Sequence, residues 1–290
     1  MIALRRRLAP YGLLGPGAIW LALFFVVPMY FMGELALRSG TFTEGFTFSW
    51  EWANFPDALS ERWEQIGRTF IYSGVATVLA LLIAYPLAYA IAVRASPRWK
   101  LLLLFAVIAP FFTTYLIRTI AWKTILADSS PIVDVLQFVS IVPDDGRLLA
   151  TSGAVIAGLT YNFLPFMILP IYASLERLDL SLIEAAKDLY ASASTAFRKV
   201  TLPLTAPGIV AGALLTFIPA FGDYINAQLL GSPNQFMIGN RIQSLYLSDR
   251  NYPEAAALSF LMMAAVVIVV FMYIRAAGTE ALMGEEEEAR

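Results

Sequence analysis

The stretch TFIYSGVATVLALLIAYPLAYAIAV, residues 69–93, carries no charged side chain and lies between Arg68 and Arg94. The hydrocarbon core of a bilayer is about 30 Å thick, and a helix needs about 20 mainly apolar residues to cross it. A helix that is apolar on every face has to be surrounded by lipid or by other protein. This stretch therefore predicts a transmembrane helix.

The rest of the chain has the same character. Of its 290 residues, 59% are hydrophobic and only 14% are charged, whereas soluble domains have about 45–50% apolar and about 25% charged residues. We therefore expect an all-α, polytopic membrane protein with about six transmembrane helices. The other five predicted helices are Leu8–Gly33, Leu101–Ile117 with a continuation past Arg118 towards Leu126, Leu148–Leu175, Val200–Gly222 and Ala255–Ile274.

Proline occurs inside most of these stretches. An interior proline destabilises a soluble helix by about 3 kcal/mol, because it removes a hydrogen bond and clashes with the preceding turn. Transmembrane helices tolerate it, since neighbouring helices satisfy the freed carbonyl. We expect kinks rather than helix ends at Pro28, Pro86, Pro110, Pro165, Pro170 and Pro219.

Basic residues collect in alternate loops, which predicts the orientation in the membrane. Arg5–Arg7 and the loop 94–100 are basic, and the loop 176–199 contains four basic residues, Arg177, Lys187, Arg198 and Lys199. The segments 34–68 and 128–147 between them are acidic. Both termini should therefore be cytoplasmic. We expect an N-terminal helix with an outer loop over 1–65, a core over 66–276, and a solvated acidic tail over 277–290.

The outer segment is rich in aromatic residues. Trp50, Trp52, Phe55 and Trp63 lie within it. Tryptophan is enriched at the boundary between lipid and water, so these rings fit either a membrane interface or a docking surface for a partner.

Several kinds of chemistry are excluded by composition. The chain has no cysteine and no histidine, which removes disulfides, thiolate nucleophiles, the usual zinc ligands and histidine-based catalysis. It also lacks the phosphate-binding loop of ATPases. We expect no catalytic residues, no metal site and no cofactor. A secondary transporter or channel would favour charged pairs in the spans or an internal repeat, and a membrane enzyme would need a cluster of reactive groups; neither is visible.

The loop at residues 176–200 is too apolar for a linker. Ser181 precedes Glu184 by three residues, the spacing of a helix-capping box, so a short amphipathic helix should begin near Ser181. A second short helix, Ser194–Val200, should lead through Leu202 and Pro203 into the next span. Exposed apolar side chains on such helices need lipid or a partner to cover them.

The same loop resembles the EAA loop of ABC importer permeases, which carries Glu-Ala-Ala followed at a fixed distance by Leu-Pro. The resemblance implies a type I ABC importer permease fold, with coupling helices that dock on a cytoplasmic ATPase. One departure stands out, since Tyr190 occupies the position of a glycine in the family. The residues that the resemblance assigns to coupling are Glu184, Ala185, Ala186, Asp188, Leu189, Tyr190, Leu202 and Pro203.

A finer resemblance favours the spermidine/putrescine branch of this family. It implies a bacterial inner-membrane permease for polyamines, with a second permease subunit that is related but different, a dimeric ATPase that binds ATP and magnesium, an extracytoplasmic substrate-binding protein and no nucleic acid. Other branches carry sugars, anions or ferric ion, and these remain alternatives. The resemblance rests on 85–89, 118–122, 161–170, 237–240 and 255–259.

Ionisable or polar groups near the spans are candidates for the substrate pathway, because they are costly in lipid. Asp223 follows Phe221 and precedes Tyr224, and a carboxylate beside aromatic rings suits an alkylammonium ion. The alternative is that Asp223 is hydrated at the outer surface. Tyr161 and Asn162 fit either the pathway or helix–helix hydrogen bonds. Two cations, Arg118 and Lys123, should instead reach the outer surface or pair with acids such as Asp128.

Overall fold

The computed structural model describes residues 14–138 and 146–277. These residues form two compact units. One unit takes the chain up to residue 63 together with 241–265, and the other takes 64–240 together with the chain from 266 onward. The linear division expected at residue 65 does not anticipate that 241–265 groups with the N-terminal segment. The basic start and the acidic tail at Glu285–Glu288 lie outside the described residues.

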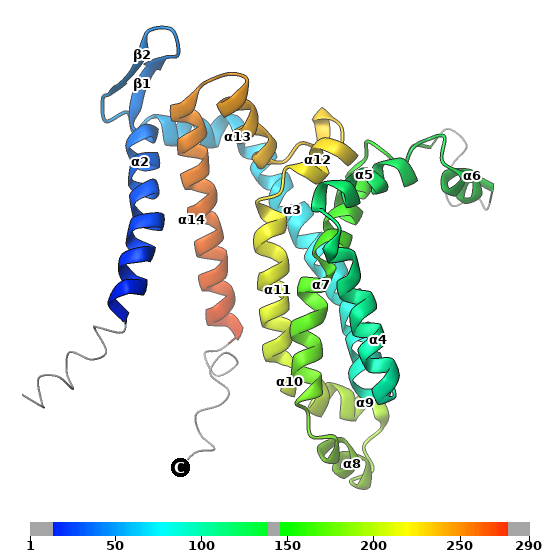
Figure 1. Cartoon of the computed structure of the whole chain (residues 1–290). Coiled ribbons are helices and arrows are strands. Elements are labelled where there is room, and N and C mark those ends of the chain that lie inside the picture. The colour runs from blue at the N-terminus through cyan, green and yellow to red at the C-terminus, as the bar shows by residue number, and fades with distance from the viewer. Residues whose placement is uncertain (1–13, 139–145, 278–290) are drawn as a thin grey trace, which may run out of the picture. The chain divides into compact units, whose positions relative to one another are not determined.

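The first unit begins with one long helix, and a hairpin follows it (Figure 1). Gly33 allows this helix to approach α14, because a Cβ there would lie 3.2 Å from a ring carbon of Phe260. The elements of this unit are Leu14–Ala36, which includes a π-helical turn at Ala22–Val26 and α2 at Val27–Ala36, then β1 (Arg38–Thr41), β2 (Gly45–Phe48), the start of α3 (Asn54–Tyr89), most of α13 (Ile238–Leu247) and the first part of α14 (Tyr252–Ala277).

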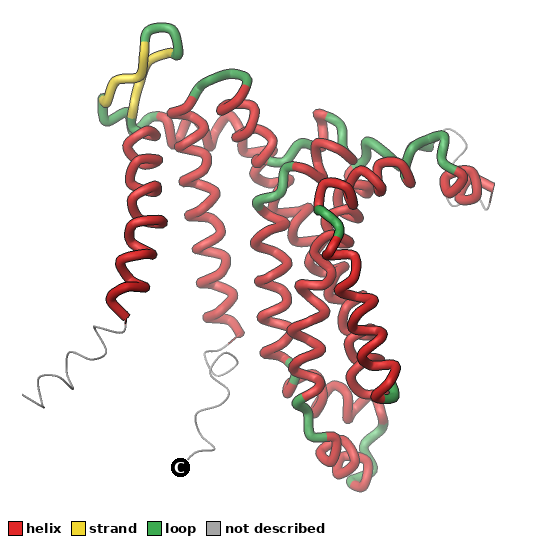
Figure 2. Tube along the Cα trace, viewed as in Figure 1, coloured by secondary structure: helices red, strands yellow, loops and turns green. Residues whose placement is uncertain are grey.

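β1 and β2 form an antiparallel hairpin, the one sheet in the part of the chain that the structure describes (Figure 2). Arg38 pairs with Phe48 in its register. The side-chain amide of Asn54 donates to the carbonyl of Ala36 at 2.9 Å, which attaches the start of α3 to the end of α2. The expectation of an all-α chain therefore misses this hairpin.

A row of aromatic rings begins at the last residue of β2, Phe48. Trp50 stacks on Trp52 with centroids 6.3 Å apart, and Phe48 and Phe55 extend the row at either end. Both tryptophan rings belong to residues that are 62% exposed, and Trp63 on α3 is 66% exposed. Exposed rings are compatible with both interpretations made from the sequence, a membrane interface and a docking surface for a partner. Both interpretations therefore stay predictions.

Ion pairs hold the start of α14 within the first unit. Arg62 lies 3.2 Å from the carboxylate of Glu254, and Asn251 donates to the other oxygen of Glu254 at 2.8 Å. Arg241 pairs with Asp249 at 2.7 Å. Because Arg62 and Glu254 are both largely shielded from solvent, removal of one partner would leave the other charge poorly compensated.

The second unit is a helical bundle. Its longest elements are the remainder of α3 and all of α7, and α8 lies at the end opposite to α5 and α12 (Figure 1). Its elements after α3 are a π-helical turn (Ala90–Arg94), α4 (Pro97–Ile108), a 3-10 turn (Ala109–Phe112), α5 (Tyr115–Ile125), α6 (Pro131–Phe138), α7 (Ser152–Glu176), α8 (Leu180–Asp188), α9 (Ala193–Ala196), a π-helical turn (Phe197–Thr201), α10 (Leu202–Leu204), α11 (Ala206–Phe221), α12 (Ile225–Leu230), a 3-10 turn (Pro233–Gln235), the first residues of α13 and the last part of α14.

α7 and α11 pack closely because glycine lines their contact. A Cβ on Gly208 would lie 2.6 Å from the carbonyl oxygen of Pro170, and one on Gly212 would lie 2.9 Å from the sulfur of Met167. Small residues of this kind let transmembrane helices approach at the level of their backbones. Buried alanines of α3 such as Ala84 also pack against apolar residues of α7.

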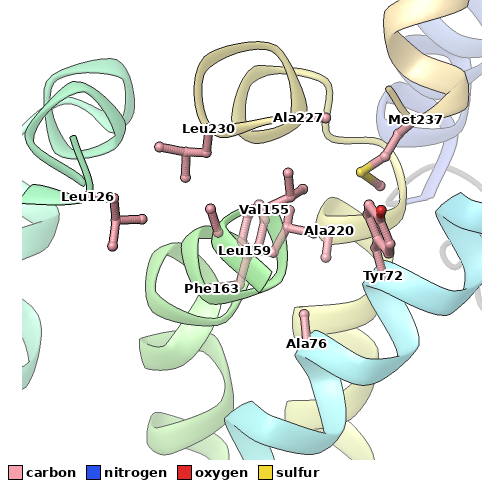
Figure 3. Packing of buried hydrophobic residues seen from close by; sticks show 11 residues of the cluster. Tyr72, Ala76, Leu126, Val155, Leu159, Phe163, Ala220, Ala227, Leu230 and Met237 are labelled. Atoms are coloured by element: carbon pink, nitrogen blue, oxygen red, sulfur yellow. The ribbon is translucent and has the colours of Figure 1, made fainter. Parts of the chain in front are cut away.

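A second apolar cluster supports the end of the bundle near α12. It joins side chains from α3, α7, α11 and α12 (Figure 3). The central residues are fully buried, so these helices form one rigid support beneath the short helix α12. The labelled members are Tyr72, Ala76, Leu126, Val155, Leu159, Phe163, Ala220, Ala227, Leu230 and Met237.

The predicted spans are recovered with two changes. The predicted span Val200–Gly222 is broken at Thr205, where the helical segment Ala193–Leu204 meets α11 at an angle of 63°. Within the described residues, four helices are long and apolar enough to cross a membrane, and two bent pairs bring the number to six if each pair is one span. The predicted span 101–117 is not continuous. It ends in the 3-10 turn that contains Pro110, and α5 leaves at an angle of 95°. Pro110 therefore lies in the turn that ends a helix, where we had expected a kink. Pro86, Pro165, Pro170 and Pro219 lie inside helices, as expected.

Candidate functional site

The loop 176–200 folds as two short helical pieces, as predicted, but its first cap differs. α8 begins at Leu180, and the carboxylate of Asp179 accepts a hydrogen bond from the backbone N–H of Ser181 at 2.9 Å. This bond lowers the pKa of the Asp179 carboxyl below its ordinary value. The predicted capping box of Ser181 and Glu184 is therefore wrong, because the acid two residues earlier takes the capping position.

α8 ends in a tight left-handed turn. The N–H of Ala191 donates to the carbonyl of Ala186 at 3.0 Å, and the N–H of Tyr190 donates to the carbonyl of Lys187 at 2.9 Å. These two bonds define a Schellman motif, which needs a residue with positive φ at its turn. Tyr190 is that residue, with φ of 60°. The turn thus stays at the position of the family glycine, although a tyrosine occupies it.

The second helical piece connects the loop to the bundle. The side chain of Ser192 caps α9 by accepting from the N–H of Thr195 at 3.2 Å. Near α10, the hydroxyls of Tyr85 and Thr205 lie 2.9 Å apart. Thr205 is fully buried, so this pair attaches the base of the loop to α3.

Most of the residues assigned to coupling lie on this loop, Leu202 and Pro203 lie on α10, and the set is largely open to solvent. Leu189 is 82% exposed and Tyr190 is 99% exposed. Ala186 is half-buried, and α8 has no fully buried residue. An apolar helix tip of this kind is suited to a protein partner. The other exposed members of the set are Glu184, Ala185, Asp188, Leu202 and Pro203.

At the other end of the bundle, Asp223 lies between α11 and α12 in a network of polar side chains. One carboxylate oxygen accepts from the backbone N–H of Asn226 at 2.9 Å, and the other accepts from the hydroxyl of Tyr115. Asp223 is only 8% exposed. The alternative expectation of a freely hydrated carboxylate at the outer surface is therefore wrong, because Asp223 is enclosed by donors from α5 and α12.

Asn162 completes the network from α7. Its amide donates to the hydroxyl of Thr119 at 3.0 Å and to the side-chain oxygen of Asn226 at 3.1 Å. Asn162, Asn226 and Thr119 are almost entirely buried. Gly158 makes room for this contact, because a Cβ there would lie 2.6 Å from the side-chain oxygen of Asn226. We call Tyr115, Thr119, Asn162, Asp223 and Asn226 the polar cluster.

The structure separates the other predicted pathway residues. Phe221 is 1% exposed and packs in the core against Phe70, with ring centroids 4.7 Å apart. Tyr161 packs edge-on against Trp122. Tyr224 is 36% exposed, so among these three aromatic residues it offers the most surface beside Asp223.

Three members of the polar cluster, Tyr115, Thr119 and Asn226, were not predicted as site residues from the sequence. Asn226 follows Asp223 by three residues, which is a capping distance and a usable signal. Tyr115 and Thr119 had no such signal, because they meet Asp223 and Asn162 only through the bend before α5.

The predicted partners of the outer cations also need correction. Arg118 lies over the ring of Phe111 with its guanidinium carbon 4.7 Å from the centroid, and Lys123 is exposed. Asp128, named as a possible partner for them, pairs instead with Arg147 at 2.8 Å. A cation over an aromatic face is stabilised by the ring quadrupole without an acid.

The fold and the loop define a class of protein, and comparison with known families agrees. The family model described as "binding-protein-dependent transport system inner membrane component" matches residues 16–278. The chain belongs to this family. It is a multi-pass permease subunit of the inner membrane, and the resemblance to ABC importer permeases is confirmed.

Individual relatives are consistent with this assignment. The chain is 36% identical over 258 residues to the spermidine/putrescine transport system permease protein PotB of Haemophilus influenzae, covering 89% of this chain and 90% of that one. It is 38% identical over 202 residues to PotB of Escherichia coli K12, covering 70% and 73%. A solved bacterial alginate ABC transporter has the same fold, with a TM-score of 0.72, 18% identity and 97% of each chain covered.

Proposed function

We propose that this chain is the permease subunit of an ATP-driven importer of polyamines. The observation that carries the substrate class is its identity of 36% to a spermidine/putrescine permease across 90% of that protein. The chain would form half of the pathway beside a related but different permease. A dimeric cytoplasmic ATPase and an extracytoplasmic binding protein would complete the assembly, with both termini of this chain in the cytoplasm.

The chain has no phosphate-binding loop of its own, so ATP and magnesium belong to the partner ATPase in this proposal. The exposed loop 176–200 would dock on that ATPase. Tyr85 and Thr205, 2.9 Å apart at its base, support the transfer of movement from the loop to the long helices, because packed elements move as rigid bodies.

The polar cluster is the proposed contact for the substrate. A polyamine carries several ammonium groups on a flexible apolar chain, so a carboxylate with aromatic neighbours matches its chemistry. An ammonium group would compete with the Tyr115 hydroxyl for the carboxylate of Asp223, while Tyr224 lies beside it in the chain. One charge-assisted contact contributes about 1.5–3 kcal/mol, or roughly tenfold to a hundredfold in occupancy.

The test is transport by the complete importer in proteoliposomes. The compounds to be tested are polyamines, a neutral sugar, an oxyanion and ferric ion. Of these, we expect only the polyamines to stimulate ATP hydrolysis. Asp223→Asn should slow polyamine uptake at unchanged assembly, whereas Asp128→Asn, at an exposed carboxylate paired with Arg147, should not. Stimulation by a sugar without response to polyamines would exclude the substrate class. Unchanged uptake by Asp223→Asn would remove that residue from the pathway.

A further inference from the structure

The turn that joins α3 to α4 carries positive charge that the chain itself does not balance. Arg94 ends the π-helical turn after α3, and Arg98 lies in the first turn of α4. Both side chains are exposed. The sequence has no aspartate or glutamate between Glu64 and Asp128, and no acid of the described residues forms an ion pair with either arginine.

Further cations lie at the same end of the bundle, which is also the end of α9 (Figure 1). The guanidinium carbon of Arg94 lies 5.7 Å from the centroid of the Tyr89 ring. Phe197 packs edge-on against that ring, with the centroids 6.3 Å apart. Arg198 and Lys199 follow Phe197 in the chain, and both are exposed. An anion at the α3–α4 turn would therefore experience an attractive field from several cations.

α4 presents an exposed apolar face that starts at its basic end. Positions separated by three, four and seven residues share one side of a helix, and the exposed residues with this spacing are Arg98, Leu101, Leu102 and Phe105. The opposite side packs against the core through Leu103, Leu104 and Val107. Because α4 belongs to one of the bent pairs that are long and apolar enough to cross a membrane, the apolar part of this face lies at the depth of lipid chains. The arginine then lies near the headgroups.

This sequence of charge and apolar surface matches an anionic phospholipid better than a soluble protein. Acyl chains would cover Leu102 and Phe105, which are 54% and 61% exposed, while the phosphate meets the cations. Trp99, in the same turn, is 61% exposed, and tryptophan is enriched at the boundary between lipid and water. Glu176, an acid that would repel such a headgroup, is paired with Lys100 at 3.4 Å.

We propose that the α3–α4 turn binds an anionic phospholipid of the surrounding membrane, with Arg94 and Arg98 on the phosphate and an acyl chain along Leu102 and Phe105. A guanidinium group suits this role because its planar donors match the oxygens of a phosphate. The bound lipid would hold the start of α4 at the depth of the headgroups. The inference needs only that the chain spans a membrane, so it does not depend on the substrate or on the ATPase.

The test uses the full-length chain in its assembled complex, reconstituted in phosphatidylcholine vesicles. The chain has no cysteine, so a fluorophore can be attached to a single cysteine that replaces Leu102, with any cysteines of co-purifying subunits changed to serine. Brominated phosphatidylglycerol should quench this fluorophore at a lower mole fraction than brominated phosphatidylcholine. Each arginine should contribute about fivefold to the preference, so Arg94→Gln and Arg98→Gln should each lower it by that factor. Arg94→Lys with Arg98→Lys keeps the charge and should keep most of the preference.

Arg147→Gln is a matched control, because it removes an exposed arginine of the same unit that pairs with Asp128. The lipid preference should not change in this variant. Equal quenching by the two lipids in the unaltered protein would overturn the proposal. Absence of quenching by either lipid would overturn it too, because it would show that another protein chain covers this face of α4. Glycerol phosphate in the buffer should not compete, and full competition would show that the site binds a free anion and has no use for the apolar face.

Discussion

Asn162 on α7 donates its side-chain amide to the oxygen of Asn226 on α12 at 3.1 Å, although 64 residues separate them in sequence. Both side chains are buried. This bond connects the long helix α7 to α12, the short helix that follows Asp223 in the chain. The position of Asp223 therefore depends on a residue that is distant in the chain.

Asn162→Ala should destabilise the second unit by about 1–3 kcal/mol, because it leaves the oxygens of Asn226 and Thr119 without the Asn162 donor. Thermal unfolding of the detergent-solubilised chain measures this. Asn234→Ala changes an exposed asparagine of the same unit and should have little effect. Equal midpoints for the two variants would show that the buried network contributes nothing to stability.

Gly208→Ala should lower the unfolding midpoint, because the new Cβ would lie 2.6 Å from the backbone oxygen of Pro170 and force α7 and α11 apart. Gly74→Ala should instead raise the unfolding midpoint. No atom lies within 4 Å of a Cβ at Gly74 on α3, and alanine is favoured over glycine in a helix by about 0.5–1 kcal/mol. If Gly208→Ala is as stable as Gly74→Ala, the close contact of α7 with α11 is not required.

Ala185→Trp should reduce transport while membrane insertion persists. Ala185 is exposed on α8, and a large ring there would overfill an interface, at a cost of about 1–3 kcal/mol. Uptake and ATPase co-purification measure the effect. Ala53→Trp places the same ring at another exposed alanine and should leave both unchanged. Normal coupling in Ala185→Trp would exclude this face of α8 from the ATPase contact.

Single cysteines at Ser49 and Ser192 should react with an impermeant thiol reagent from opposite sides of the membrane. The chain has no cysteine of its own, and both positions are exposed, so labelling reports sidedness alone. Intact and permeabilised cells distinguish the two faces. Reaction of both positions from one side would contradict the topology inferred from the basic loops.

Much of the fold was predictable because lipid imposes a simple rule on sequence. A charge-free stretch of sufficient length has one stable environment. Residues 69–93 were therefore recognisable without knowledge of any contact, and they lie within the candidate span Asn54–Arg94, which consists of α3 and the π-helical turn after it. The loop 176–200 was equally visible, since its apolar positions stand out between charged neighbours. The hairpin of β1 and β2 was missed, because four-residue strands give too short a pattern to distinguish from a loop.

The sequence alone determined the membrane class, the approximate spans and the position of the short helices in the loop 176–200, because these follow from local composition and spacing. The tertiary structure decided which polar residues meet. Asp223 is recognisable as an acid at the end of a span, but its contact with Tyr115 depends on the bend after Pro110. The conformation of Tyr190 was likewise decided by the fold, since the backbone bonds that close the turn force a tyrosine into the place of a glycine.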